Sequence, residues 1–133
     1  MSALTRFFFT PVYAPRSMWS VVNWWESRRA IYNLAVGAAG IFSLTFVAFS
    51  AVFHPFPVPF RVPVLGILAY AIMANLCYSM GPAIDVLIHR HWGSEYAVVG
   101  PTLFRYGFVF SIGLSLLPIP VAALAWMARL FFK

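Results

Sequence analysis

The chain has 133 residues, of which 62% are hydrophobic and 9% are charged. Soluble proteins average roughly 45–50% apolar and about 25% charged residues, and small domains bury only about two-thirds of the surface that the unfolded chain exposes. This composition excludes a water-soluble fold. The formal net charge is +6, but the basic residues are scattered along apolar segments. They do not form the concentrated basic face that nucleic-acid binding requires, so we expect no nucleic-acid partner.

Residues 1–29 are predicted to form an interfacial N-terminal segment that is retained, because residues 1–10 lack the apolar core and cleavage site of a secretory signal. Within it, residues 17–29 place apolar side chains on one helical face and polar ones on the other, which predicts an amphipathic helix capped by Ser17. Tryptophan and arginine favour the headgroup level of a membrane. The expected membrane-interface anchors are Trp19, Trp24, Trp25, Arg28 and Arg29.

Three stretches of 23 or 24 residues contain no Asp, Glu, Lys or Arg: residues 30–53, 62–84 and 106–128. As helices they would each reach about 35 Å, slightly more than the roughly 30 Å hydrocarbon core of a bilayer. Only helices satisfy the backbone polar groups of such isolated segments in lipid. The sequence therefore predicts an all-α integral membrane protein of one domain. Its three transmembrane helices are expected at residues 30–53, 62–88 and 102–131.

The basic residues next to these spans predict the orientation. Six of them fall on the side that contains the N-terminus and three on the opposite side. The positive-inside rule then predicts a cytoplasmic N-terminus and an external C-terminus. We expect a multi-pass protein of a bacterial-type inner membrane, either cytoplasmic or photosynthetic.

Small side chains recur at four-residue spacing in two of the spans, which predicts flat faces for close helix packing. The third span carries Gly107, Ser111 and Ser115, and the first carries Ala35, Ala39 and Ser43. Prolines interrupt the backbone hydrogen bonds of a helix, so bends are expected at Pro82 and near Pro118.

Few polar residues fall within or beside the spans. Asp85 follows the second charge-free stretch, and we expect it to form an ion pair with Arg90 or Arg105. An Asp85 that faced a water-filled cavity would instead favour a transport function. Asn33 and Asn75 are expected to bond to helix backbones or to each other.

No catalytic site is expected. The only acids are Glu26, Asp85 and Glu95, which lie in different segments, and no phosphate-binding loop or nucleophile motif is visible. The single cysteine, Cys77, excludes an intramolecular disulfide and a cysteine-based metal site. We therefore predict a protein that is not an enzyme and has no metal site, no intrinsic cofactor and no soluble substrate.

Ser50 and His54 form the one pattern that suggests a cofactor. A small residue four positions before a histidine resembles the pigment-binding helix of bacterial antenna polypeptides, and that resemblance implies that His54 ligates a pigment or haem. The resemblance covers two residues. It departs from the antenna pattern because those polypeptides span once and carry the histidine inside the helix, whereas Pro55 stops this helix directly after His54.

Aromatic side chains are abundant, with 14 Phe, 6 Tyr and 5 Trp, and three helices cannot enclose most of them. This surface predicts contacts with other integral membrane subunits and membrane lipids, and peripheral contacts with quinone, (bacterio)chlorophyll or carotenoid tails. The function that we expect is a non-catalytic accessory subunit of a larger, energy-transducing membrane complex. A photosynthetic reaction-centre–antenna assembly is slightly preferred over a respiratory complex. The alternative is a small oligomeric transporter or channel component.

Overall fold

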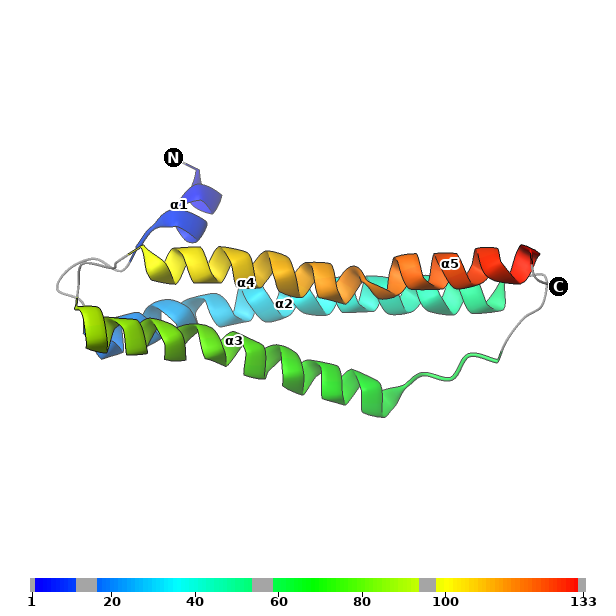
Figure 1. Cartoon of the computed structure of the whole chain (residues 1–133), viewed down its shortest axis with the longest axis horizontal. Helices are drawn as coiled ribbons and strands as arrows, with labels where there is room; N and C mark the ends of the chain where they lie inside the picture. Colours follow the sequence, from blue (N-terminus) through cyan, green and yellow to red (C-terminus); the bar gives the residue numbers. More distant parts are fainter. Residues whose placement is uncertain (1, 12–16, 54–58, 94–97, 132–133) are drawn as a thin grey trace.

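The computed structural model describes residues 2–11, 17–53, 59–93 and 98–131, and all of the regular structure within these ranges is helical. The helices in chain order are α1 (Ala3–Phe9), α2 (Met18–Val52), α3 (Val64–Trp92), α4 (Val99–Leu116) and α5 (Pro118–Phe131). Figure 1 shows α2, α3 and the α4–α5 pair side by side along the long axis, with the short α1 leaning against one end.

Within the described ranges, three segments are long and apolar enough to cross a membrane: α2 with 35 residues, α3 with 29, and α4 together with α5 with 33. At 1.5 Å per residue each exceeds the roughly 30 Å hydrocarbon core. The prediction of an all-helical protein with three candidate spans is confirmed at this level.

The N-terminal part of α2 differs from the sequence prediction. The helix runs unbroken from Met18 to Val52, so residues 17–29 form its first turns and not a separate amphipathic helix. No proline or glycine occurs between Met18 and Gly37, and nothing in that stretch breaks the helix. The predicted cap is confirmed, because the Ser17 side chain accepts a hydrogen bond from the Ser20 backbone N–H.

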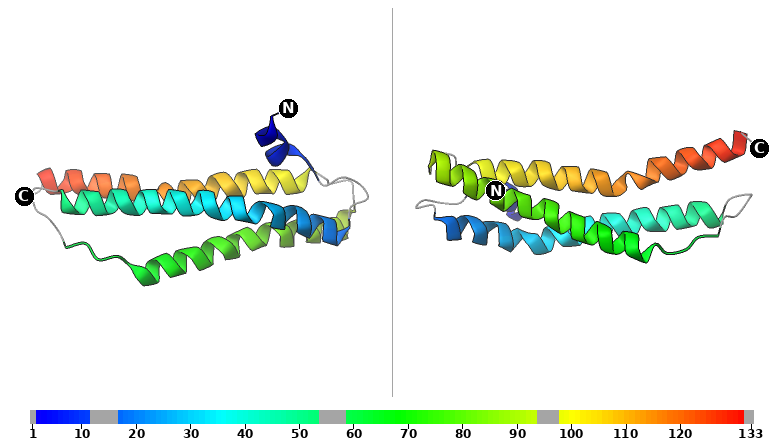
Figure 2. Two further views of the ribbon diagram at one scale, coloured as in Figure 1. Left: turned by 180° about the vertical axis from the view of Figure 1, so that it is seen from behind. Right: turned by 60° about the horizontal axis from the view of Figure 1, so that its bottom comes forward.

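The third span is divided at its prolines. α4 ends at Leu116 and α5 begins at Pro118, with the Leu117 N–H donating to the Leu114 carbonyl. Pro118 has no N–H to donate to that carbonyl, so a tighter turn replaces the regular bond. The helix axis bends at this point in Figure 2. α3, in contrast, continues through Pro82, whose ring is buried.

The two ends of the bundle differ. At the end that carries α1, which we call the α1 end, the start of α2, the end of α3 and the start of α4 lie close together (Figure 1). At the opposite end, the α5 end, α2 stays beside α5 while α3 diverges from both (Figure 2). The buried hydrophobic residues lie towards the α1 end: Val21, Trp25, Tyr32, Val36, Tyr78 and Phe104.

Candidate functional site

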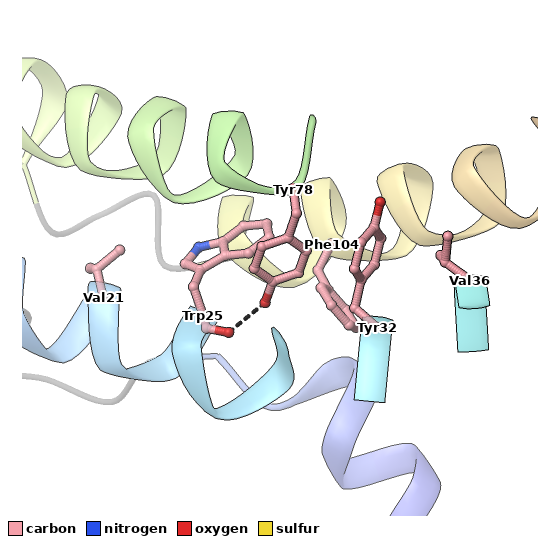
Figure 3. Packing of buried hydrophobic residues seen from close by; sticks show 6 residues of the cluster. All are labelled: Val21, Trp25, Tyr32, Val36, Tyr78 and Phe104. Atoms are coloured by element: carbon pink, nitrogen blue, oxygen red, sulfur yellow. Dashed lines mark hydrogen bonds between the residues drawn. The ribbon is translucent and has the colours of Figure 1, made fainter. Parts of the chain in front are cut away.

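The candidate site is the polar and aromatic cluster inside the α1 end. Figure 3 shows side chains from α2, α3 and α4 converging there, with Tyr78 and Phe104 facing Trp25 and Tyr32. Phe104 lies at its centre and its ring is 2% exposed. Its ring centroid lies within 6.5 Å of those of Phe7, Phe8, Trp24, Trp25, Tyr78 and Phe108. Most of these pairs are edge-to-face, the geometry that the ring quadrupoles favour.

Asp85 is a fully buried carboxylate within this cluster. The Trp25 indole N–H donates to its Oδ2 at 3.0 Å, which joins α2 to α3. A Cβ at Gly100 would lie 2.5 Å from the same oxygen, so α4 approaches the carboxylate closely only because residue 100 has no side chain. A buried charge is stable only when hydrogen bonds replace its hydration. Trp25 supplies one of these bonds.

Tyr78 joins the same two helices in the opposite direction. Its hydroxyl donates to the backbone carbonyl of Trp25 (Figure 3). One turn further along α3, a Cβ at Gly81 would lie 2.5 Å from the Trp25 ring. The indole therefore occupies a slot that Gly81 leaves open, its N–H is bound by Asp85, and its ring packs edge-to-face with that of Tyr78.

Arg28 holds α1 against the bundle. Its guanidinium donates to the carbonyl of Phe7 through Nε and Nη2, at 3.1 and 3.0 Å, and to the carbonyl of Trp24 through Nη1 at 3.0 Å. It also lies 3.7 Å from the centroid of the Trp24 ring, a cation–π contact. The Trp24 indole N–H donates in turn to the carbonyl of Thr10.

A second group of hydrogen bonds links the helices further along the bundle. The Tyr32 hydroxyl donates to Ser111 Oγ at 2.9 Å, and the Ser43 hydroxyl donates to the Ser115 carbonyl at 2.6 Å. Tyr70 bonds to Ser115 Oγ and to the Val36 carbonyl. Hydroxyls of three helices thus satisfy one another inside apolar segments, where lipid offers no substitute.

A third group faces outward along the line where α2 and α3 meet. Arg29 makes a two-point ion pair with Glu26 at 2.9 and 2.7 Å and approaches Ser79 at 3.5 Å. One turn further along α2, Asn33 Nδ2 donates to Asn75 Oδ1 at 3.3 Å. Asn75 donates to the Ala71 carbonyl, so the prediction that these amides bond to each other and to backbone is confirmed.

The structure separates the five residues that were predicted to be interface anchors. Trp19 is exposed, Trp24 is partly buried, and Arg29 lies at the surface beside Glu26. Trp25 and Arg28 instead point inward, the first to Asp85 and the second to α1. These two side chains contact neighbouring elements, because acceptors there bind their N–H groups. Their expected contacts with headgroups stay a prediction.

The predicted packing stripes are only partly brought together. Ser43 and Ser115 are buried, Ser111 is half-buried, and all three take part in the hydrogen bonds between helices. Ala35 and Ala39 are half-buried on α2. Gly107 is exposed and a Cβ there would meet nothing within 4 Å, so it is not part of a helix contact in this chain.

The expected ion pair of Asp85 with Arg90 or Arg105 stays a prediction. One contact of Asp85 is its hydrogen bond with Trp25, while the Arg105 guanidinium lies 4.5 Å from the centroid of the Phe9 ring and Arg90 is exposed. His54, the expected pigment or haem ligand, lies outside the described residues.

Two grooves of about 320 Å³ each open on the surface of the bundle. One lies between α3 and α4 beside Cys77, Gly81 and Gly107, and the other lies between α2 and α5 beside Ser50 and Trp126. Asp85 lines neither groove. Within the described ranges, no group of three His, Cys, Asp or Glu side chains could hold a metal ion. The arrangement of the site is suited to joining helices.

Sequence reasoning missed several members of the site: Tyr32, Tyr70, Tyr78, Gly81, Gly100 and Phe104. A signal was available for the tyrosines, because a hydroxyl inside a charge-free stretch needs a partner from another helix. No such signal marks Gly81, Gly100 or Phe104, whose roles depend on which helix faces them.

The chain matches no protein-family model, no curated protein and no solved structure. The interpretation of the site therefore rests on its geometry.

Proposed function

We propose that this protein is a non-catalytic accessory subunit of a larger integral membrane complex. The observation that carries the proposal is the contrast between the closed α1 end and the exposed first turns of α3. Residues 64–69 are all exposed, and they include Leu65 at 83% and Leu68 at 55%. Helical turns that are apolar and exposed on every side would be covered by neighbouring transmembrane helices together with lipid.

The polar groups of the site support the same proposal. The tyrosine and serine hydroxyls near the middle of the bundle are engaged with other helices of this chain, and Trp25 and Arg28 are likewise bound internally. Side chains committed in this way hold a scaffold together and are not poised to transfer protons or bind a substrate. The α3–α4 and α2–α5 grooves suit acyl, prenyl or pigment tails as peripheral contacts.

The host is proposed to be an energy-transducing complex of a bacterial-type inner membrane, with a photosynthetic assembly slightly preferred over a respiratory one. The aromatic exterior supports this choice, since large planar side chains suit pigment and quinone surfaces. The N-terminus is proposed to be cytoplasmic. Reporter fusions after Lys133 and within residues 93–100 should then lie on opposite sides of the membrane.

The test is purification of the native, tagged protein in mild detergent, followed by mass spectrometry and an absorption spectrum. We expect companion subunits in fixed stoichiometry. Deletion of the gene should lower the amount or the cofactor content of that complex, while turnover per intact complex changes little. Migration of the native protein alone would contradict the proposal.

The alternative, a small transporter or channel component, is tested by Asp85→Asn in liposomes. Asparagine keeps an oxygen that can accept the Trp25 N–H. The accessory role therefore predicts that Asp85→Asn changes the assembly and the turnover of the complex very little. Solute or ion flux through the purified protein that Asp85→Asn abolishes would overturn the accessory role.

A further inference from the structure

The outward-facing amide pair on α2 and α3 is exceptional among the polar groups of the bundle. Asn75 lies near the middle of the charge-free stretch of residues 62–84, and Asn33 contacts it from a position one turn beyond Arg29. Asn33 is exposed. The hydroxyls at similar positions, such as those of Tyr32 and Ser111, are directed between helices of the chain.

The amides retain hydrogen-bonding capacity that nothing in the described part of the chain uses. Asn33 commits one N–H to Asn75 and accepts no hydrogen bond there, and Asn75 commits one N–H to the Ala71 carbonyl. One acceptor oxygen and two N–H groups are left without a partner in the described part of the chain. Hydrocarbon cannot satisfy them, and polar side chains in spans almost always face protein or water.

The side chains around the amides allow a close approach. Ala30 and Gly37 lie three residues before and four residues after Asn33, which places them on the same face of α2. Ala30 is exposed, and a Cβ at Gly37 would meet nothing within 4 Å. A neighbouring backbone can therefore come near enough for short amide side chains to meet.

The chemistry of this face is complementary to itself. An amide both donates and accepts, so Asn33 of one copy can pair reciprocally with Asn33 of another across a two-fold axis. The nearby ion pair holds one negative and one positive group, Glu26 and Arg29, so two such faces carry no net charge and do not repel. A two-fold interface requires this self-complementarity of a single patch.

We propose that this face, made by Ala30, Asn33, Gly37 and Asn75, binds a second copy of the chain in the membrane. The two α2 helices would meet along it, and reciprocal amide hydrogen bonds would fix their register, as a buried asparagine does in a coiled coil. This interface goes beyond the accessory function and does not depend on it.

The test is cysteine cross-linking of the purified chain in liposomes, where no other protein is present. In a Cys77→Ala background, Ala30→Cys places a thiol on the proposed interface, and Val109→Cys places one on an exposed position of α4. Oxidation should link Ala30→Cys chains into a species of twice the mass of the chain. Val109→Cys should give only the background expected from random collisions.

Substitutions of Asn33 test whether its amide stabilises the dimer. Asn33→Leu should weaken dimerisation by about tenfold, the effect of losing reciprocal hydrogen bonds of roughly 1–2 kcal/mol in total. Asn33→Gln keeps the amide and should retain most of the cross-link. Thr45→Val is the matched control, since Thr45 is an exposed polar residue of α2 whose hydroxyl bonds to its own helix at Ile41.

Three results would overturn the interface. The first is equal cross-linking of Ala30→Cys and Val109→Cys, and the second is an Asn33→Leu variant that cross-links as well as its parent. The third is an Ala30→Cys adduct with a different protein in native membranes, combined with no adduct between copies in liposomes. If Asn33→Leu does not fold, the two cysteine positions and Asn33→Gln still test whether this face binds a second copy. A dimer that purifies without companions would contradict the accessory function and leave this interface intact.

Discussion

The same three helices pack differently at their two ends. At the α1 end, Phe104, Trp25 and Tyr78 interlock, and a buried carboxylate, an indole and a tyrosine hydroxyl join the helices. At the α5 end, α3 leaves the bundle and side chains such as Leu65 and Leu124 face outward. Both regions are rich in apolar residues. The difference lies in the directional groups, which are concentrated at the α1 end.

The contrast shows which interactions determine how the helices of a small apolar bundle pack together. Lipid is as apolar as a leucine side chain, so exclusion of apolar surface does not by itself drive helices together. Hydrogen bonds, ring stacking and close backbone approach do so, and each needs particular residues at facing positions. The first turns of α3, residues 64–69, carry no polar or aromatic side chain, and their position depends on what surrounds them.

The sharpest test of this comparison removes one large ring from each environment on a single helix. Phe104→Ala should destabilise the protein by about 3–5 kcal/mol, because a ring at the centre of the cluster leaves a cavity. Phe110→Ala, at a position that is 67% exposed on the same helix, should cost less than about 0.5 kcal/mol. Reversible unfolding in mixed micelles, followed by tryptophan fluorescence, measures both. Similar losses would contradict the packed core.

Adding a methyl group tests the slot around Trp25. Gly81→Ala should cost about 1–3 kcal/mol, because the new Cβ would overlap the Trp25 indole, whose N–H is bound by Asp85. Gly113→Ala, where a Cβ meets nothing within 4 Å, should leave stability unchanged or raise it. The same unfolding assay applies. A neutral Gly81→Ala would show that the ring is free to move.

The attachment of α1 is tested by replacing the guanidinium that binds Phe7 and Trp24. Arg28→Lys keeps the charge but loses the planar guanidinium with its several N–H donors. The attachment of α1 to the bundle should therefore weaken by about 1 kcal/mol. Arg29→Lys is the control, since its ion pair with Glu26 is at the surface and is worth little. Hydrogen exchange of the backbone amides of residues 3–9 should accelerate in the first variant only.

The smallest expected effect concerns a single hydroxyl. Ser43→Ala removes a hydrogen bond to the Ser115 carbonyl of another helix and should cost about 0.6 kcal/mol, the average measured for such bonds in membranes. Ser50→Ala removes a hydroxyl that bonds to Val47 in its own helix and should cost less. Equal losses of stability in the two variants would show that a hydrogen bond between helices stabilises this protein no more than one within a helix.

The three candidate spans could be predicted from the sequence because length and apolar composition suffice to identify helices that could cross a membrane. The bend near Pro118 was also predictable, since proline lacks the N–H that a regular helix requires. The Asn33–Asn75 contact followed from the same reasoning, because an amide in an apolar stretch needs a polar partner. Each of these predictions depends only on the properties of one residue type in one environment.

The interior of the α1 end could not be predicted in the same way. Trp25 and Arg28 belong to residue types that favour headgroups and also favour contacts between helices, and their own segment does not decide between the two. What decides is that Asp85 and Gly81 face Trp25, and that α1 presents a carbonyl to Arg28. Those pairings depend on how distant segments align, which periodicity along one helix does not specify.

The most direct test of the contrast between the two ends is a pair of spin-label distance distributions in the purified chain, with Cys77 replaced by alanine. One pair of labels, at Leu87 and Tyr106, reports on α3 and α4 at the α1 end. The other pair, at Leu65 and Leu124, reports on α3 and α5 at the α5 end. All four positions are exposed. We predict a narrow distribution for the first pair and a broad one for the second. Equally narrow distributions at both ends would contradict this contrast, because the first turns of α3 would then be fixed by the chain itself.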